Sequence, residues 1–190
     1  TISSFTTTAA DLYGNTLQET VPTGSVFDGK TIAIDTSAPT TTITAVEYTD
    51  GVDGTGTLVL TGDNFTGTNG LGVTQGSDAS TYLNWGNLAW NVTGATGTPT
   101  SVTFNPELTS AIVTNNTTMT ITLDADTNTA LKGTVDFAAQ GAADSVVITA
   151  GFIKDIAGNA STTDAATLAP DYTDTGRPTV TSFTTTTPTG

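Results

Sequence analysis

Two short acidic patterns, each present twice, contain the side chains of this 190-residue chain best suited to hold a cation. Asp-x-x-Gly-Asn occupies residues 11–15 and 155–159, and Asp-Thr-x-x-Pro-Thr occupies residues 35–40 and 174–179. Aspartates gathered at one end of a fold repel each other unless a cation lies between them. The chain has only four basic residues to neutralise them. We therefore expect Asp11 to converge with Asp35, and Asp155 with Asp174, around a divalent cation.

The same patterns are also turn and linker signals. Gly and Asn tolerate positive φ, so Asp-x-x-Gly-Asn predicts a tight turn between the last two strands of a domain. The proline of the second pattern ends a strand and predicts a stiff junction to the next domain. The two copies of each pattern are about 140 residues apart, which suits a repeated domain and not a solenoid unit.

Composition excludes several classes of function. The net charge is −14, and the chain has no His and no Cys. Nucleic-acid binding and docking on anionic membranes both need Lys and Arg, so neither is expected. Ser-His-Asp and Cys-His catalysis are impossible, as are the common zinc sites, which leaves a carboxylate pair as the remaining catalytic option. We predict a protein that is not an enzyme and does not insert into a membrane.

The elements that position these residues are predicted to be strands. Thr, which favours strands, accounts for 48 residues. The clearest case is residues 118–123, where Met119, Ile121 and Leu123 alternate with threonines. No helical period is sustained, although a short turn near 106–112 is possible, and Trp85 and Trp90 are expected in the core. The predicted strands are 42–48, 57–61, 81–84, 87–92, 101–104, 110–114, 118–123, 133–137 and 145–150. This pattern predicts an all-β, antiparallel sandwich over residues 39–177.

The flanks are too short for complete domains. Residues 1–38 contain too little apolar sequence to fold alone and are read as the last part of a preceding module. Residues 178–190 are read as the first strand of a following one, and we interpret the chain as a mature fragment or an excised segment. Residues 179–186 (TVTSFTTT) closely match residues 1–8 (TISSFTTT), so one tail could add a strand to the other in an assembly.

The boundary patterns, together with residues 142–159 (AADSVVITAGFIKDIAGN), resemble those of bacterial Ig-like repeats in large secreted adhesins and S-layer-like surface proteins. The resemblance is close at the module ends and loose in the middle, where this module is longer. It implies an Ig-like sandwich at the cell surface, with partial Ig-like modules on either side. It also implies structural calcium at the boundaries, held by Asp11, Asn15 and Asp35 on one side and by Asp155, Asn159 and Asp174 on the other.

Two further acidic segments could take part. Asp50 and Asp53 lie on a Gly-containing loop and could complete the first boundary site, although the same residues also suit an ordinary turn. Asp124-x-Asp126-x-Asn128 lacks the Gly and Glu that an EF-hand loop needs, so a turn at a strand end is the better interpretation.

The predicted function is a non-catalytic structural or adhesive module, with neighbouring modules or identical subunits as partners. Two alternatives remain open: a subunit of a layer or filament joined by strand exchange, and a carbohydrate-binding module that stacks a surface glycan on Trp85, Trp90 or Tyr82.

Overall fold

A computed structural model describes residues 35–51, 53–67, 69–93, 99–104, 110–138 and 144–174. The described residues from Thr36 onward belong to one compact unit. Predictions for residues 1–34 and 175–190, including Asp11, Asn15 and the two partial modules, lie outside the described residues.

The described part is an all-β sandwich with one α-helix. Its strands are β1 (Thr42–Asp50), β2 (Gly56–Asp63), β3 (Leu88–Thr93), β4 (Pro99–Thr103), β5 (Ser110–Asn115), β6 (Thr118–Leu123), β7 (Ser145–Ile148), β8 (Ala166–Leu168) and β9 (Asp171–Asp174). The helix is α1 (Ala125–Lys132), and two short 3₁₀ turns are η1 (Ser80–Tyr82) and η2 (Trp85–Asn87).

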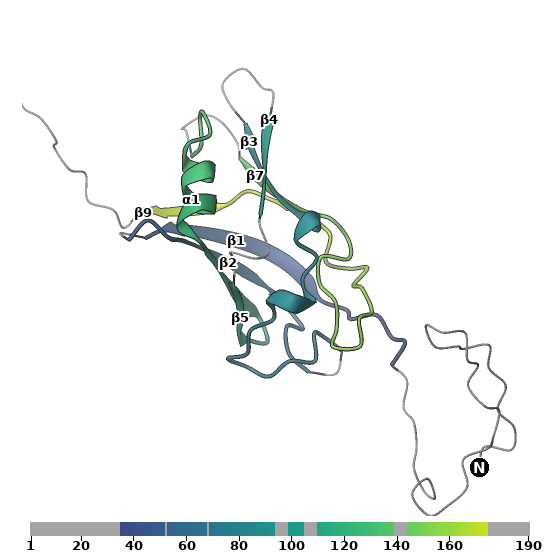
Figure 1. The fold of residues 1–190 in the computed structure, drawn as a ribbon. Helices are drawn as coiled ribbons and strands as arrows, with labels where there is room; N and C mark the ends of the chain where they lie inside the picture. The colour runs from purple at the N-terminus through teal and green to yellow at the C-terminus, as the bar shows by residue number, and fades with distance from the viewer. Residues whose placement is uncertain are drawn as a thin grey trace, which may run out of the picture. The chain divides into compact units, whose positions relative to one another are not determined.

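The strands form two sheets. One has the order β5-β6-β2-β1-β9 and the other β4-β3-β7-β8. Figure 1 shows β3, β4 and β7 above the sheet that contains β1, β2 and β5. The pairings between these strands are antiparallel except that of β1 with β9, so the predicted antiparallel sandwich contains one parallel pair.

The core lies between the sheets and follows the alternation seen in the sequence. Met119, Ile121 and Leu123 of β6 are fully buried, as predicted. From the opposite sheet Trp90 is also fully buried, and its ring meets that of Tyr48 edge-on at a centroid distance of 5.5 Å. The prediction that Trp85 and Trp90 belong to the core is confirmed.

Helix α1 was not predicted. The Asp124 carboxylate caps it by accepting hydrogen bonds from Asp126 N, Thr127 N and the Thr127 hydroxyl at 2.6–3.0 Å. Lys132 lies in the last turn and Gly133 follows the helix, which completes a regular set of helix end signals. The segment Asp124–Asn128 is therefore the start of a helix, and not the turn at a strand end that the sequence predicts.

Four other segments differ from the prediction. Residues 133–137 form turns and not a strand: Val135 is 81% exposed and Asp136 has a φ of 68°. Residues 81–84 contain the end of η1 and one isolated bridge at Leu83. Strands β8 and β9, of three and four residues, were not expected.

Candidate functional sites at the two ends of the domain

We call the end of the sandwich where β1 begins at Thr42 the proximal end, and the end where β1 finishes at Asp50 the distal end. Because β1 has nine residues, the two ends are about 30 Å apart. The residues predicted to bind calcium divide between them.

Asp155 and Asn159 form a closed turn at the proximal end, in the connection between β7 and β8. The Asp155 carboxylate accepts hydrogen bonds from Ala157 N at 2.9 Å, Asn159 N at 2.8 Å and Asn159 Nδ2 at 2.9 Å. Gly158 provides the positive φ, 91°, that the turn needs. The Asp-x-x-Gly-Asn pattern is thus explained locally, because its first and last residues hold each other.

The environment of Asp155 favours the ionised carboxylate. Asp155 is only 5% exposed. Burial pushes its pKa upward, but the hydrogen bonds from Asn159 and the turn backbone outweigh this and hold the pKa below its usual value.

Contacts around this turn place it at the proximal end. Ile156 N donates to Leu71 O at 3.0 Å. A few residues further on, the Thr163 hydroxyl donates to Thr41 O at 2.8 Å, just before β1 begins. Asp164, which is fully buried here, accepts bonds from Gly151 N and Ile153 N at 3.0 and 2.7 Å. Burial raises the Asp164 pKa despite these bonds.

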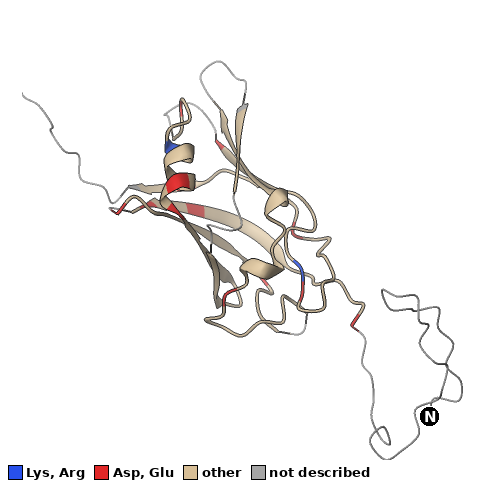
Figure 2. Ribbon diagram, viewed as in Figure 1, with Lys and Arg blue, Asp and Glu red and all other residues tan. Residues whose placement is uncertain are grey.

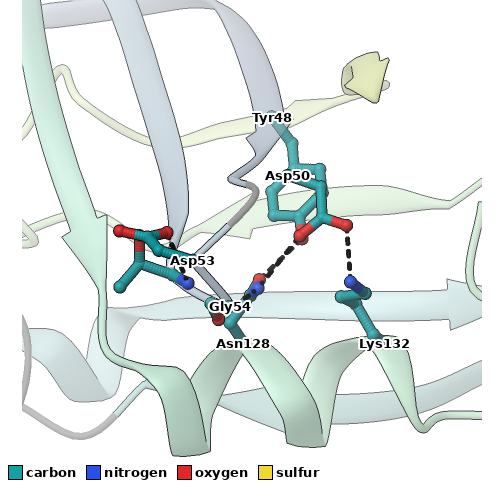
Figure 3. Close-up of polar contacts among 7 residues, drawn as sticks. Tyr48, Asp50, Asp53, Gly54, Asn128 and Lys132 are labelled. Carbon is teal, nitrogen blue, oxygen red and sulfur yellow. Dashed lines mark hydrogen bonds and ion pairs between the residues drawn. The ribbon is translucent and has the colours of Figure 1, made fainter. Parts of the chain in front are cut away.

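At the distal end, Asp50 belongs to a polar network with helix α1 (Figure 3). One carboxylate oxygen of Asp50 accepts from Asn128 Nδ2 at 3.2 Å, and the other is ion-paired with the Lys132 ammonium. Asn128 also donates to Gly54 O at 2.9 Å and accepts from the Tyr48 hydroxyl at 2.6 Å. Helix α1 is thereby joined to the loop between β1 and β2.

The backbone at Gly56, the first residue of β2, lies so close to Asn128 that no larger residue fits there. A Cβ at position 56 would lie 2.4 Å from Asn128 Oδ1, closer than van der Waals contact allows. Gly56 therefore lets β2 begin against the helix.

The other acidic residues of the distal end have simpler surroundings. Asp53 is exposed and accepts bonds from Thr55 N and the Thr55 hydroxyl, and the hydroxyl bond is the main reason that its pKa lies below the usual value. The backbone of Asp174 pairs with that of Asp50 at the end of the β1–β9 ladder. Figure 2 shows the acidic residues distributed over the described domain, with few basic ones among them.

Two geometric expectations are therefore wrong. Asp155 and Asp174 do not converge, because one lies at the proximal end and the other at the distal end. Asp50 lies beside the Asp174 backbone and Asp53 follows in the loop between β1 and β2, so neither is at the proximal end, where the chain arrives from the Pro39 junction. Asp35 is exposed and is the first residue described. Among the described residues no three carboxylates come together as a metal-binding group.

Sequence reasoning also missed a buried carboxylate, Asp144, which is 4% exposed. It accepts hydrogen bonds from the Tyr172 hydroxyl at 2.6 Å, Thr93 N at 3.0 Å, Ala138 N at 3.1 Å and Trp90 Nε1 at 3.4 Å. It thus joins β9 to β3 and to the segment after α1. The sequence does contain one indication of this site, because Asp144 lies among apolar residues immediately before β7.

The tryptophans do not provide an exposed platform for a sugar. An open hollow of about 480 Å³ is lined by Trp85 together with Ser80 and Phe104. Trp85 is only 5% exposed, and its indole donates to Ser80 O at 3.2 Å. Trp90 is fully buried. Neither ring presents a face on which a pyranose could stack.

The longest helix among the described residues is α1, with eight residues, and no helix in this part of the chain has the length and apolar character of a membrane span. Comparisons of the chain with protein-family models, with curated proteins and with solved structures give no match.

Proposed function

We propose that the chain is a non-catalytic structural or adhesive repeat module of a large extracellular surface protein, in which similar modules follow one another in tandem. The duplicated boundary patterns support repetition. The Thr-rich composition with very few basic residues is typical of secreted surface proteins.

The observation that carries the proposal is the direction of the first and last strands. β1 and β9 are neighbours and run parallel, in register from Glu47 with Asp171 to Asp50 with Asp174. A chain that arrives at the start of β1 must therefore leave at the opposite end of the domain, as Figure 1 shows. Modules linked in this way form an extended array, whereas an antiparallel terminal pair would bring both junctions to one end.

The order of the strands supports an Ig-like assignment. In immunoglobulin domains one sheet contains strands A, B, E and D and the other contains C, F and G, with C′ added in variable types. The orders β1-β2-β6-β5 and β3-β7-β8, with β4 beside β3, follow the same pattern. β9 continues the last strand into the first sheet.

Calcium at the junctions is the second part of the proposal. The charge of −14 supports it, because an extended array of such modules needs cations to offset repulsion. The described side chains fit calcium only in part. The carboxylates of Asp50, Asp53 and Asp155 already accept hydrogen bonds from the protein, and on their own they do not make up six to eight oxygen ligands.

The alternative of assembly by strand exchange is less well supported at one sheet edge. The outer side of β5 is occupied by residues 76–79: Gly76 N donates to Val113 O, Val113 N to Ser77 O and Ala79 N to Ala111 O. An edge covered in this way does not accept a foreign strand. Strand exchange at this edge is therefore not expected, and the tandem-module proposal predicts a monomer in size measurements at several protein concentrations.

The test is the length of a tandem array in solution. Chains containing one, two and four copies of residues 39–177 should give a maximum dimension, by small-angle X-ray scattering, that grows by at least about 30 Å per copy. Calcium should narrow the distribution of lengths relative to excess EDTA. A matched array with residues 175–177 of each copy replaced by Gly and Ser should lose this response. Arrays that fold back, so that the dimension does not grow with copy number, would refute the proposal.

A further inference from the structure

The parallel pairing of β1 with β9 has a mechanical consequence. We propose that the β1–β9 pair is a shear clamp, the element that resists unfolding when the two ends of the domain are pulled apart. This inference rests on the proposed function, since tension reaches the domain through its neighbours. It adds a specific force-bearing element to that function.

The geometry of the ladder determines how its hydrogen bonds are loaded. Tension pulls β1 back toward Thr42 and β9 onward beyond Asp174, and because the strands are parallel these directions are opposite along one line. The paired residues, from Glu47 to Asp50, must then slide past their partners together. All bonds of the ladder are strained at once. An antiparallel terminal pair would instead open one bond at a time and yield at lower force.

Side chains add to the backbone ladder of β9. The Tyr172 ring lies against the rings of Phe137, Trp90 and Tyr48, with centroid distances of 5.7, 5.9 and 6.3 Å. Its hydroxyl donates to the buried Asp144 carboxylate at 2.6 Å. A sliding β9 must therefore pull this partly exposed ring away from the three rings that it contacts and break its bond to the Asp144 carboxylate.

The other end of the load path is also attached at several points. Just before β1, Thr40 N donates to Asn69 O at 2.9 Å and the Thr41 hydroxyl to Asn64 O at 3.1 Å. Thr41 O accepts from the Thr163 hydroxyl at 2.8 Å. Tension at the proximal end is thus shared with two loops, so it reaches the β1–β9 ladder without first peeling β1 away.

The experiment compares two directions of pulling on the same fold. The chain has no cysteine, so introduced cysteines define the attachment points for single-molecule force spectroscopy. Thr1→Cys with Gly190→Cys loads the β1–β9 pair in shear. Asp53→Cys with Gly190→Cys applies force at the distal end of both strands, so the same pair unzips. We expect at least a twofold higher unfolding force in the first geometry. Equal forces in the two geometries would overturn the clamp.

Two matched hydroxyl deletions test the side-chain contribution. Tyr172→Phe should raise the unfolding rate at constant force in the shear geometry roughly tenfold or more, because a hydrogen bond to a charged acceptor is lost. Its effect in the unzipping geometry should be smaller. Tyr82→Phe makes the same chemical change outside the clamp and should leave the shear unfolding rate unchanged. Equal effects of both variants in the shear geometry would overturn the assignment of Tyr172.

The outcome for the clamp is separate from that for the tandem array. Extended arrays with equal forces in both pulling directions would retain the proposed function and remove the clamp. Arrays that fold back, combined with a strong dependence on pulling direction, would do the reverse.

Discussion

Replacement of the buried Asp144 should give the clearest test of how β3, β9 and the segment after α1 are arranged, because this one carboxylate contacts all three. Its carboxylate accepts bonds from Tyr172, Thr93 N, Ala138 N and, at a longer distance, Trp90 Nε1. Asp144→Ala leaves two backbone N–H groups and one hydroxyl without their acceptor. A buried donor left unsatisfied costs roughly 1–3 kcal/mol.

The expected loss follows from these contacts. The bond to Trp90 is long and adds little, and Tyr172 is 40% exposed, so its hydroxyl can be partly rehydrated. We therefore expect Asp144→Ala to lower the free energy of unfolding by about 3–5 kcal/mol, against a total of about 5–15 kcal/mol for a typical domain. Tyr172→Phe alone should cost about 1–2 kcal/mol.

A double-mutant cycle then isolates the pair. If Tyr172 and Asp144 bond as described, Tyr172→Phe should cost much less in the Asp144→Ala background, with a coupling energy of about 1–2 kcal/mol. Urea unfolding followed by tryptophan fluorescence measures all four free energies, because Trp90 lies at the site. Additive losses, or a loss of less than about 1 kcal/mol for Asp144→Ala, would refute the reasoning.

Three further tests address the core, the proximal turn and the response to pH. Met119→Asp should unfold the domain by far-UV circular dichroism, since it buries an unpaired charge, whereas Thr120→Asp on the other face should be tolerated; equal effects would contradict the strand's orientation. Asp155→Ala should lower the thermal midpoint by the same amount in EDTA and in CaCl₂ if Asp155 only closes its turn, and by more in CaCl₂ if it binds the ion. Burial, and then the bond to Asp144, raise the pKa of the Tyr172 hydroxyl, so the folded state holds the hydroxyl proton more tightly than the unfolded state. The free energy of unfolding should therefore be constant below about pH 10, the ordinary tyrosine pKa, and should fall at higher pH. Urea titrations at alkaline pH should show a smaller fall for Tyr172→Phe.

The strands predicted correctly are those with a repeated two-residue period. Residues 118–123 alternate over six positions, and the sheet buries one set and leaves the other partly exposed. Residues 133–137 also alternate, with Val135 and Phe137 apolar, but Gly133 and the positive φ of Asp136 belong to turns. β9 has four residues, too few for a period to be recognised, and its position beside β1 depends on the whole topology.

Helix α1 shows a different limit. Its eight residues include two threonines and an asparagine, which are weak helix formers, so neither propensity nor periodicity predicts it. The end signals were present, with Asp124 before the helix and Gly133 after it. The distal network is even harder to predict from the sequence, because Asn128 and Lys132 contact Asp50 across 78 and 82 residues.

Charge alone suggests that the aspartates at the two ends need a cation, but the structure shows that buried aspartates find other partners. With four basic residues in the chain, a divalent ion seemed the natural partner for clustered aspartates. Yet the buried aspartates 144, 155 and 164 each accept two backbone N–H groups. Such bonds favour the ionised carboxylate without a cation, and at Asp155 they outweigh the effect of burial.

Backbone amides therefore take the role that Lys and Arg have in other proteins, which allows an acidic chain to bury aspartates. Because these short contacts are covered, monovalent salt should screen them little, and it should stabilise the domain mainly by reducing repulsion among the exposed charges. Calcium at the junctions then requires more than a rise in the thermal midpoint. The rise must exceed that in NaCl of equal ionic strength, and it must disappear when the junction aspartates 35 and 174 are replaced by asparagine. If NaCl gives the same rise, repulsion alone accounts for the effect and the calcium part of the proposal fails.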